Sequence, residues 1–127
     1  MNKRHIHTEH APKAIGTYSQ AIKNGEWLFL SGQIPLDPHT MQLVGDDFVV
    51  QTHQVFKNLL AVLQAAGGEV ADVVKLTVYL VDLNQFVLFN EVMAQYFSEP
   101  YPARAVVQVA ALPKAAKVEV EGIAVVN

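Results

Sequence analysis

Residues 47–68 read DFVVQTHQVFKNLLAVLQAAGG, and their apolar side chains recur at spacings of three and four positions. This period places the apolar side chains along one face of an α-helix, which predicts a helix of about five turns. Asp46 or Asp47 can cap its first turn, and Gly67 can end it. The predicted buried stripe consists of Phe48, Thr52, Val55, Phe56, Leu59, Leu60, Val62, Leu63 and Ala66.

Upstream of this helix, residues 17–32 read TYSQAIKNGEWLFLSG and divide into two apolar-rich halves around Asn24-Gly25. This pair tolerates the positive φ angles of a tight turn better than other residues do. We therefore expect a β-hairpin, in which Lys23 faces Glu26 across the turn. The single tryptophan, Trp27, is most simply interpreted as a core residue.

Downstream of the helix, residues 72–82 read DVVKLTVYLVD, a β-branched run typical of a strand. Alternation places Val74, Leu76, Val78 and Leu80 on one face of it, and Lys75, Thr77 and Tyr79 on the other. Residues 82–97 have helical spacing again, and residues 103–110 and 116–126 are two more predicted strands. The second helix is expected to bury Phe86, Phe89, Met93, Tyr96 and Phe97. This order of elements predicts an α+β domain with one mixed sheet and both crossover helices on the same face.

The bulk composition narrows the class of protein. A chain of 127 residues that is 51% hydrophobic and 17% charged is expected to form one domain, residues 1–127. It contains no cysteine, so thiol chemistry is excluded. The net charge of -3 and the lack of a lysine and arginine stripe argue against a nucleic-acid partner. Because no stretch resembles a signal peptide or a membrane span, we expect a cytoplasmic protein without a membrane partner.

Strand alternation also predicts which side chains lie on the face without helices. In the last strand these are Lys117, Glu119, Glu121, Ile123 and Val125. The preceding strand, PARAVVQVA at residues 102–110, divides into two sets: Arg104, Val106 and Gln108, and Ala105, Val107 and Val109. If the smaller apolar set packs under the helices, Arg104 lies with Glu119 and Glu121 on the helix-free face.

This helix-free face would carry more apolar area than a solvated sheet face needs, since Tyr79, Val106, Ile123 and Val125 are assigned to it. We expect other copies of the chain to cover it in a closed ring, with charged groups lining clefts between subunits. In such a cleft the planar fork of Arg104 could hold a carboxylate through two hydrogen bonds. The alternative, which spacing alone leaves open, is an ion pair of Arg104 with Glu119 or Glu121 that ties the sheet together.

Several blocks of the sequence occur together in a known family. They are APKAIGTYSQAI, LFLSGQIPLDP, QTHQVFKNLLAVLQAAG, VVKLTVYLVDLNQFVLFNEV, YPAR and VAALPKAAKVEVEGIAV. On these blocks the chain resembles, nearly end to end, the RidA/YjgF family of reactive imine and enamine deaminases, also described as L-PSP endoribonucleases. The resemblance implies a chorismate-mutase-like α+β fold and a homotrimer with three clefts at its subunit boundaries. It also implies hydrolysis of 2-iminobutanoate and 2-iminopropanoate to 2-oxo acids and ammonia, without a cofactor or metal.

The resemblance also implies roles for individual residues. Arg104 resembles the arginine that clamps the substrate carboxylate, and Glu119 the glutamate that orients or activates water. The positions that line the same pocket are matched here by Tyr18, Ser31, Gly32 and Asn90. Tyr18 could donate a hydrogen bond to the imine nitrogen or to the attacking water. Backbone N–H groups near Gly32 or Val106 could hold the second edge of the carboxylate. The departures from the family pattern at Thr17, Ala105 and Val106 bear on substrate range rather than reaction type.

Two other function classes are also compatible with the sequence. One is endoribonuclease or translation-inhibitor activity, which the acidic charge balance disfavours. The other is a regulatory trimer that binds small 2-oxo acids without turnover. A metal site at His5, His7 and His10 is disfavoured because no acidic or fourth histidine ligand follows at a suitable spacing. His53, in the middle of the first helix, is expected to face solvent.

Overall fold

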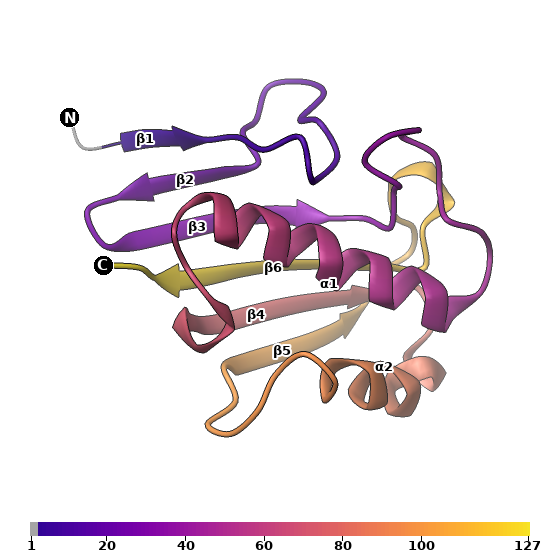
Figure 1. The fold of residues 1–127 in the computed structure, drawn as a ribbon. Helices are drawn as coiled ribbons and strands as arrows, with labels where there is room; N and C mark the ends of the chain where they lie inside the picture. The colour runs from indigo at the N-terminus through magenta and orange to yellow at the C-terminus, as the bar shows by residue number, and fades with distance from the viewer. Residues whose placement is uncertain (1–2) are drawn as a thin grey trace.

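Six strands form one mixed sheet in the computed structural model, which describes residues 3–127 of the chain (Figure 1). The strands are β1 (Lys3–Ile6), β2 (Ala21–Asn24), β3 (Trp27–Gln33), β4 (Val73–Leu80), β5 (Ala103–Gln108) and β6 (Val118–Val125). Their order across the sheet is β1-β2-β3-β6-β4-β5. Neighbours are antiparallel except for β4 and β5, which are parallel.

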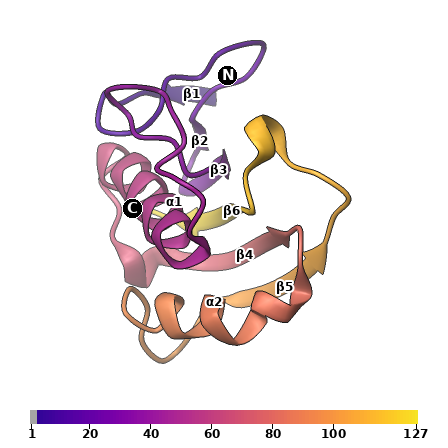
Figure 2. The same cartoon turned by 90° about the vertical axis from the view of Figure 1, so that its right-hand side faces the viewer.

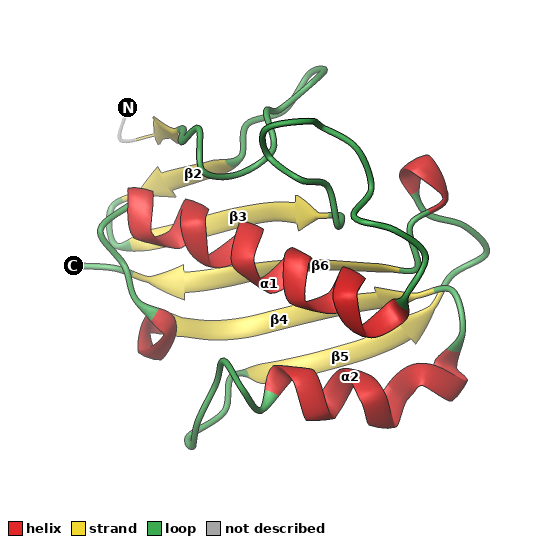
Figure 3. Ribbon diagram, turned by 45° about the vertical axis from the view of Figure 1, so that its right-hand side comes forward, coloured by secondary structure: helices red, strands yellow, loops and turns green. Residues whose placement is uncertain are grey.

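Helices α1 (Phe48–Ala65) and α2 (Phe86–Met93) lie on the same face of this sheet (Figure 3). In the view turned by 90°, the other face of the sheet carries no α-helix, and only the short 3₁₀ turn Pro113–Ala115 is drawn on that side (Figure 2). The predicted α+β class, with a mixed sheet and two helices on one face, is therefore confirmed. No helix within residues 3–127 has the length and apolar character that a membrane crossing needs.

The first helix begins and ends close to its predicted bounds. The side chain of Asp47 accepts a hydrogen bond from the amide of Val50 at 2.9 Å and caps the first turn. Gly67 follows the helix at a φ of 83°, where a residue without a Cβ is favoured. All members of the predicted stripe are buried except Leu60, which is partly buried.

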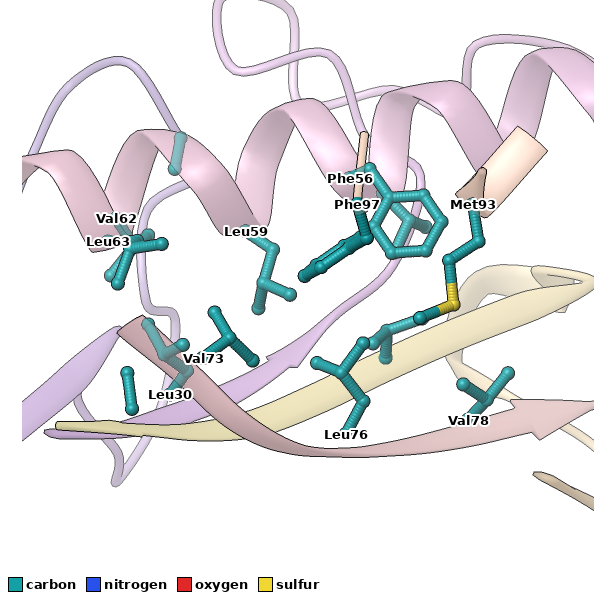
Figure 4. Close-up of a cluster of buried hydrophobic side chains, with 14 of the residues drawn as sticks. Leu30, Phe56, Leu59, Val62, Leu63, Val73, Leu76, Val78, Met93 and Phe97 are labelled. Carbon is teal, nitrogen blue, oxygen red and sulfur yellow. The ribbon is translucent and has the colours of Figure 1, made fainter. Parts of the chain in front are cut away.

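The core between α1 and the sheet is apolar and contains an aromatic cluster (Figure 4). Phe56 is fully buried at its centre, and its ring centroid lies 5.5 Å from that of Phe89 and 5.7 Å from that of Phe97. Since Phe89 belongs to α2 and Phe97 follows it, this cluster fixes α2 against α1. The cluster thereby also sets where α2 lies relative to β5.

The β2–β3 hairpin is confirmed, but its turn differs from the prediction. Asn24 pairs with Trp27, so Gly25 and Glu26 are the two turn residues and Lys23 pairs with Leu28. Gly25 has a φ of 61°, as expected for a glycine at the first position of a two-residue turn. Glu26 therefore does not face Lys23, whose ammonium donates to the Gly25 carbonyl at 2.8 Å.

Two details of the downstream elements also correct the prediction. The pairing of β4 with β6 shifts between Val73 and Lys75, so Val73 is buried and Val74 is exposed. Such a bulge moves the preceding side chains to the opposite face. The second helix is shorter than predicted, because residues 83–85 form a 3₁₀ turn, and Phe86 is partly exposed.

The sequence suggested that His53 faces solvent, but in the structure its ring contacts another side chain. Its Nδ1 lies 2.7 Å from the Tyr96 hydroxyl, which links the middle of α1 to the turn that follows α2. Burial raises the pKa of Tyr96, so the hydroxyl keeps its proton at neutral pH. The pair therefore contributes a hydrogen bond between two segments far apart in the sequence.

Tyr96→Phe is expected to lower the free energy of unfolding by about 1 kcal/mol, because it leaves a partly buried ring nitrogen of His53 without its partner. Urea unfolding followed by circular dichroism measures this change. Tyr101→Phe is the control: Tyr101 is exposed, so its loss should change stability by less than about 0.5 kcal/mol. Equal midpoints for the two variants would show that the His53 contact contributes nothing.

Candidate functional site

Arg104, in β5, lies against α2 on the helix face of the sheet. Its Nη1 donates to Asn90 Oδ1 at 2.7 Å and lies 3.5 Å from Met93 Sδ. Its guanidinium carbon is 5.4 Å from the centroid of the Phe86 ring, within cation–π range. A cavity of about 570 Å³ opens beside it, lined by Asn90, Met93, Ala94, Tyr101, Pro102 and Arg104.

The predicted position of Arg104 on the helix-free face is wrong. In the parallel register Leu76 pairs with Arg104 and Val78 with Val106, and both partners are buried under the helices. Paired residues share a face, so Arg104 and Val106 lie on the helix side. The reason is that β5 is an edge strand with nearly all of its side chains exposed, so burial cannot decide which set faces the helices.

The helix-free face carries Glu119, as predicted, in a second and separate cavity of about 690 Å³. The Glu119 side chain is partly buried, and this burial raises the pKa of its carboxyl group, to which the nearby Glu121 carboxylate adds. Tyr79, the cross-strand partner of Glu119, donates its hydroxyl to Glu121. This hydrogen bond is the main cause that raises the pKa of Tyr79 to about 12.

Gly32 provides the space that the Glu119 carboxyl group occupies. A Cβ built on Gly32 would lie 2.9 Å from Glu119 Cδ and closer still to Oε2. Gly32 sits in β3, where the pairing with β6 shifts between Leu30 and Gln33. The irregular strand and the missing side chain together bring the β3 backbone against the carboxyl group.

Two more predicted residues line the Glu119 cavity. Tyr18, 53% exposed, comes from the segment between β1 and β2, and Ser31 comes from β3. The Ser31 hydroxyl donates to the Ser19 carbonyl, so its oxygen remains free to accept a hydrogen bond. Lys13, Lys114, Ile15 and Met41 also line this cavity; they could not be identified from the sequence, because nothing in their spacing distinguishes them.

The predicted site residues therefore form two groups in one chain. Tyr18, Ser31, Gly32 and Glu119 surround one cavity, whereas Arg104 and Asn90 line the other, with Val106 two residues further along β5. The groups lie on opposite faces of the sheet. An intrachain ion pair of Arg104 with Glu119 or Glu121, the alternative left open by spacing, does not fit this geometry.

The helix-free face is more apolar than the sequence predicted. Trp27 is 53% exposed and Phe29 46% exposed, and they pair with Val125 and Ile123 on β6. Trp27 is therefore not a core residue. Val107, rather than Val106, adds an exposed apolar side chain from β5. Exposed aromatic and β-branched side chains gathered on one sheet face are typical of a surface that a protein partner covers.

Potential metal ligands do not converge in the described part of the chain. Within residues 3–127, no group of three or more His, Cys, Asp or Glu side chains could hold a metal ion. His5 and His7 have ring centroids 6.2 Å apart at the β1 edge of the sheet, far along the sheet order from β6 and β5.

Comparisons with known proteins identify the class. The sequence profile described as Endoribonuclease L-PSP matches residues 8–126. A RutC family protein of Pyrococcus horikoshii is 54% identical over 122 residues, which are 96% of this chain and 97% of that protein. The human 2-iminobutanoate/2-iminopropanoate deaminase is 46% identical over 123 residues, 97% of this chain and 90% of that protein.

Solved structures agree with the sequence comparison. RidA from an Antarctic Psychrobacter species has a TM-score of 0.94 and 52% identity, and the match covers 97% of this chain and 99% of that one. Escherichia coli TdcF, solved with bound serine, has a TM-score of 0.93 and 44% identity, with coverage of 98% and 100%. The fold and these similarities define a small α+β protein of the RidA type. The chain belongs to the Endoribonuclease L-PSP family, which includes the RidA proteins, as the sequence blocks suggested.

Proposed function

We propose that this protein hydrolyses reactive 2-imino acids to 2-oxo acids and ammonia, in clefts between the subunits of a homotrimer. The observation that carries the proposal is the separation of Arg104 and Glu119 onto opposite faces of the sheet. Each cavity holds half of the groups that such a reaction needs. Two relatives point the same way, since the human protein and the 48% identical Arabidopsis thaliana protein are both named as deaminases.

The Arg104 cavity would bind the carboxylate of the imino acid. A planar guanidinium can hold a carboxylate through two parallel hydrogen bonds, and Asn90 and Phe86 hold it in place here. The amide of Val109 donates to the Leu80 carbonyl on β4. Because backbone groups alternate along a strand, the amide of Val106 then faces the free edge of β5 and can hold the same carboxylate.

The Glu119 cavity would supply the water. Glu119 accepts a hydrogen bond from a water molecule and takes its proton as the oxygen attacks C2 of the imine. Glu119 returns this proton to the imine nitrogen as the C=N bond becomes a single bond, which gives a neutral carbinolamine. Glu119 then accepts the hydroxyl proton and passes it to the amino group, so that ammonia leaves as the C=O bond forms. Glu119 is suited to these transfers because its raised pKa lies closer to neutrality than that of a solvated glutamate.

Two copies are needed to bring the two halves together. The free edge of β5 on one copy, with Arg104 and Val106, would lie against the helix-free face of the next, beside Glu119. The exposed Trp27, Phe29 and Val107 give this face the apolar area that a stable interface buries. Closing three such contacts into a ring would make three equal clefts.

Imine hydrolysis by the purified protein can be measured directly. A threonine dehydratase that releases 2-iminobutanoate is run with semicarbazide, which traps free imine as a semicarbazone absorbing in the ultraviolet. We expect added wild-type protein to suppress the trapped product in proportion to its concentration while the yield of 2-oxobutanoate stays constant. An unchanged semicarbazone rate at protein concentrations equal to the dehydratase would overturn the proposal.

Binding without turnover is a second candidate, and the serine bound to E. coli TdcF favours it. The same clefts would then hold small 2-oxo or amino acids as regulatory ligands. Calorimetric binding of 2-oxobutanoate together with an unchanged semicarbazone rate would favour this function over hydrolysis. RNA cleavage, which the family description suggests, requires degradation of a labelled RNA that Glu119→Gln abolishes.

Gly32→Ala is expected to displace the Glu119 carboxyl group and lower kcat for imine hydrolysis roughly 10–100-fold, because catalysis is sensitive to misplacement by about 1 Å. The melting temperature should change little, since the glutamate is flexible and can turn away. Gly25→Ala is the matched control: no atom lies within 4 Å of its added Cβ, but its φ is 61°. This control should lose stability and keep kcat; full kcat in Gly32→Ala would contradict the positioning role.

A further inference from the structure

Strained backbone gathers around the Glu119 cavity. Within residues 3–127, the non-glycine residues with left-handed φ are Met41 at 61°, Lys114 at 57° and Ala115 at 59°. Met41 and Lys114 line the cavity, and Ala115 follows Lys114 directly. Residues with a Cβ adopt this conformation rarely, and those that keep it are concentrated at functional sites. Met41 is the least expected of the three, because a long apolar side chain offers no local hydrogen bond in return.

The loop that holds Met41 is closely tied together by hydrogen bonds. The Met41 amide donates to the Asp37 carbonyl at 2.8 Å, and the Asp37 amide donates to the Gln42 carbonyl at 2.9 Å. The Asp37 carboxylate accepts from the amides of His39 at 2.7 Å and Thr40 at 3.1 Å. These bonds fix the backbone of residue 41, and glycine would meet the same geometry without strain. The loop therefore explains the conformation but not the methionine side chain.

The Glu119 cavity explains the methionine side chain better than the loop does. Glu119, Ser31 and Gly32 lie where the water and the reacting carbon belong in the proposed reaction, and the other polar lining residues are Lys13, Tyr18, Gln33, Lys114 and Glu121. The remaining lining includes apolar side chains from two other segments: Ile15, which is 72% exposed, lies between β1 and β2, and Met41 lies between β3 and α1. These connections lie at the same end of the sheet (Figure 1).

We propose that Met41, together with Ile15, determines which substrate side chain this site accepts, and that it favours imino acids with longer aliphatic side chains. The inference rests on the proposed function and names its substrate class. With the carboxylate at Arg104 of one copy and C2 beside Glu119 of the next, the substrate side chain must occupy the rest of the cavity. An apolar, adaptable methionine there binds aliphatic side chains by excluding water.

The test compares imino acids generated in situ by an L-amino-acid oxidase from alanine, leucine and aspartate, in wild type, Met41→Gly and Met41→Leu. Met41→Gly removes the side chain and suits the backbone, whereas Met41→Leu keeps the apolar volume. We expect Met41→Gly to lower kcat/KM for the leucine-derived imine about tenfold and leave the alanine-derived imine within about twofold. Met41→Leu should keep the wild-type ratio, and the melting temperature of each variant reports its folding.

Other outcomes would overturn either the role of Met41 or the proposed function itself. Equal losses on the alanine and leucine substrates, or an unchanged ratio in Met41→Gly, would overturn the role of Met41. A wild-type preference for the aspartate-derived imine would overturn it too, since Lys13 and Lys114 in the same cavity would then bind an acidic side chain. Wild-type protein that hydrolyses none of the three would instead refute the proposed function, and this inference with it.

Discussion

Arg104→Ala is expected to lower kcat/KM for 2-iminobutanoate roughly 10²–10⁴-fold, because two charge-assisted hydrogen bonds to the substrate carboxylate disappear. The fold should be unaffected, since Arg104 is exposed and its partners Asn90 and Met93 stay in place on α2. Arg104→Lys is the matched control. It keeps the charge but not the planar fork, so it should recover only part of the loss. Activity of the alanine variant within tenfold of wild type would contradict the clamp.

The position of Arg104 allows a sharper form of this experiment. If each cleft takes Arg104 from one copy and Glu119 from the next, a ring that mixes Arg104→Ala and Glu119→Gln chains has one intact cleft. Three-quarters of randomly assembled trimers are mixed, so co-refolding equal amounts should restore about a quarter of wild-type activity. Each variant alone should stay inactive. If a mixture shown to contain mixed oligomers recovers no activity, then Arg104 and Glu119 belong to the same half of the cleft.

Glu119→Gln is expected to lower kcat roughly 10²–10⁴-fold, the usual contribution of a positioned general base. The pH profile gives a second readout. As a base, Glu119 acts when ionised, so wild-type activity should fall as the pH drops through its raised pKa, at a less acidic pH than for a solvated glutamate. This acid limb should disappear in Glu119→Gln. Glu121→Gln should instead move it to lower pH, because a neighbouring negative charge is removed.

The same pKa predicts the effect of Glu119→Gln on stability. A carboxyl group whose pKa is raised in the folded state binds its proton more tightly there than in the unfolded chain. Stability therefore decreases as the pH rises from the ordinary glutamate pKa through the raised one. Glu119→Gln should accordingly have a melting temperature at or above that of wild type at pH 7, with a smaller difference at pH 4. A lower melting temperature at pH 7 would show that Glu119 serves the fold instead.

Elements with one buried face could be predicted from the sequence in detail. The stripe of α1 and the alternation of β6 were assigned correctly, because α1 and the sheet centre exclude water from one set of residues and not the other. β5 lacks this contrast, since it lies at the sheet edge, and Arg104 was placed on the wrong face for that reason. Val74 was misplaced because a bulge leaves no mark in a run of β-branched residues.

The candidate site was predicted only in part for a related reason. The identities of Glu119, Tyr18, Ser31 and Gly32 came from family blocks, and the structure brings these four around one cavity. Met41 could not be found, because the positive φ of its backbone depends on hydrogen bonds around Asp37 that spacing does not reveal. The division of the site into two halves likewise follows from strand register, which pairs Arg104 with the buried Leu76 and Glu119 with Tyr79 on the opposite face.

In the proposed assembly, the free edge of β5 also affects how a single, unassembled chain behaves. An edge strand with exposed backbone groups and apolar side chains such as Val107 is a template for irregular strand pairing and aggregation. A charged side chain on such an edge opposes that pairing, and Arg104 is the only charged residue in β5. Subunit assembly would therefore protect the chain from aggregation as well as complete its clefts. Variants that weaken the interface should be judged by solubility and light scattering, because they would form aggregates rather than a clean population of monomers.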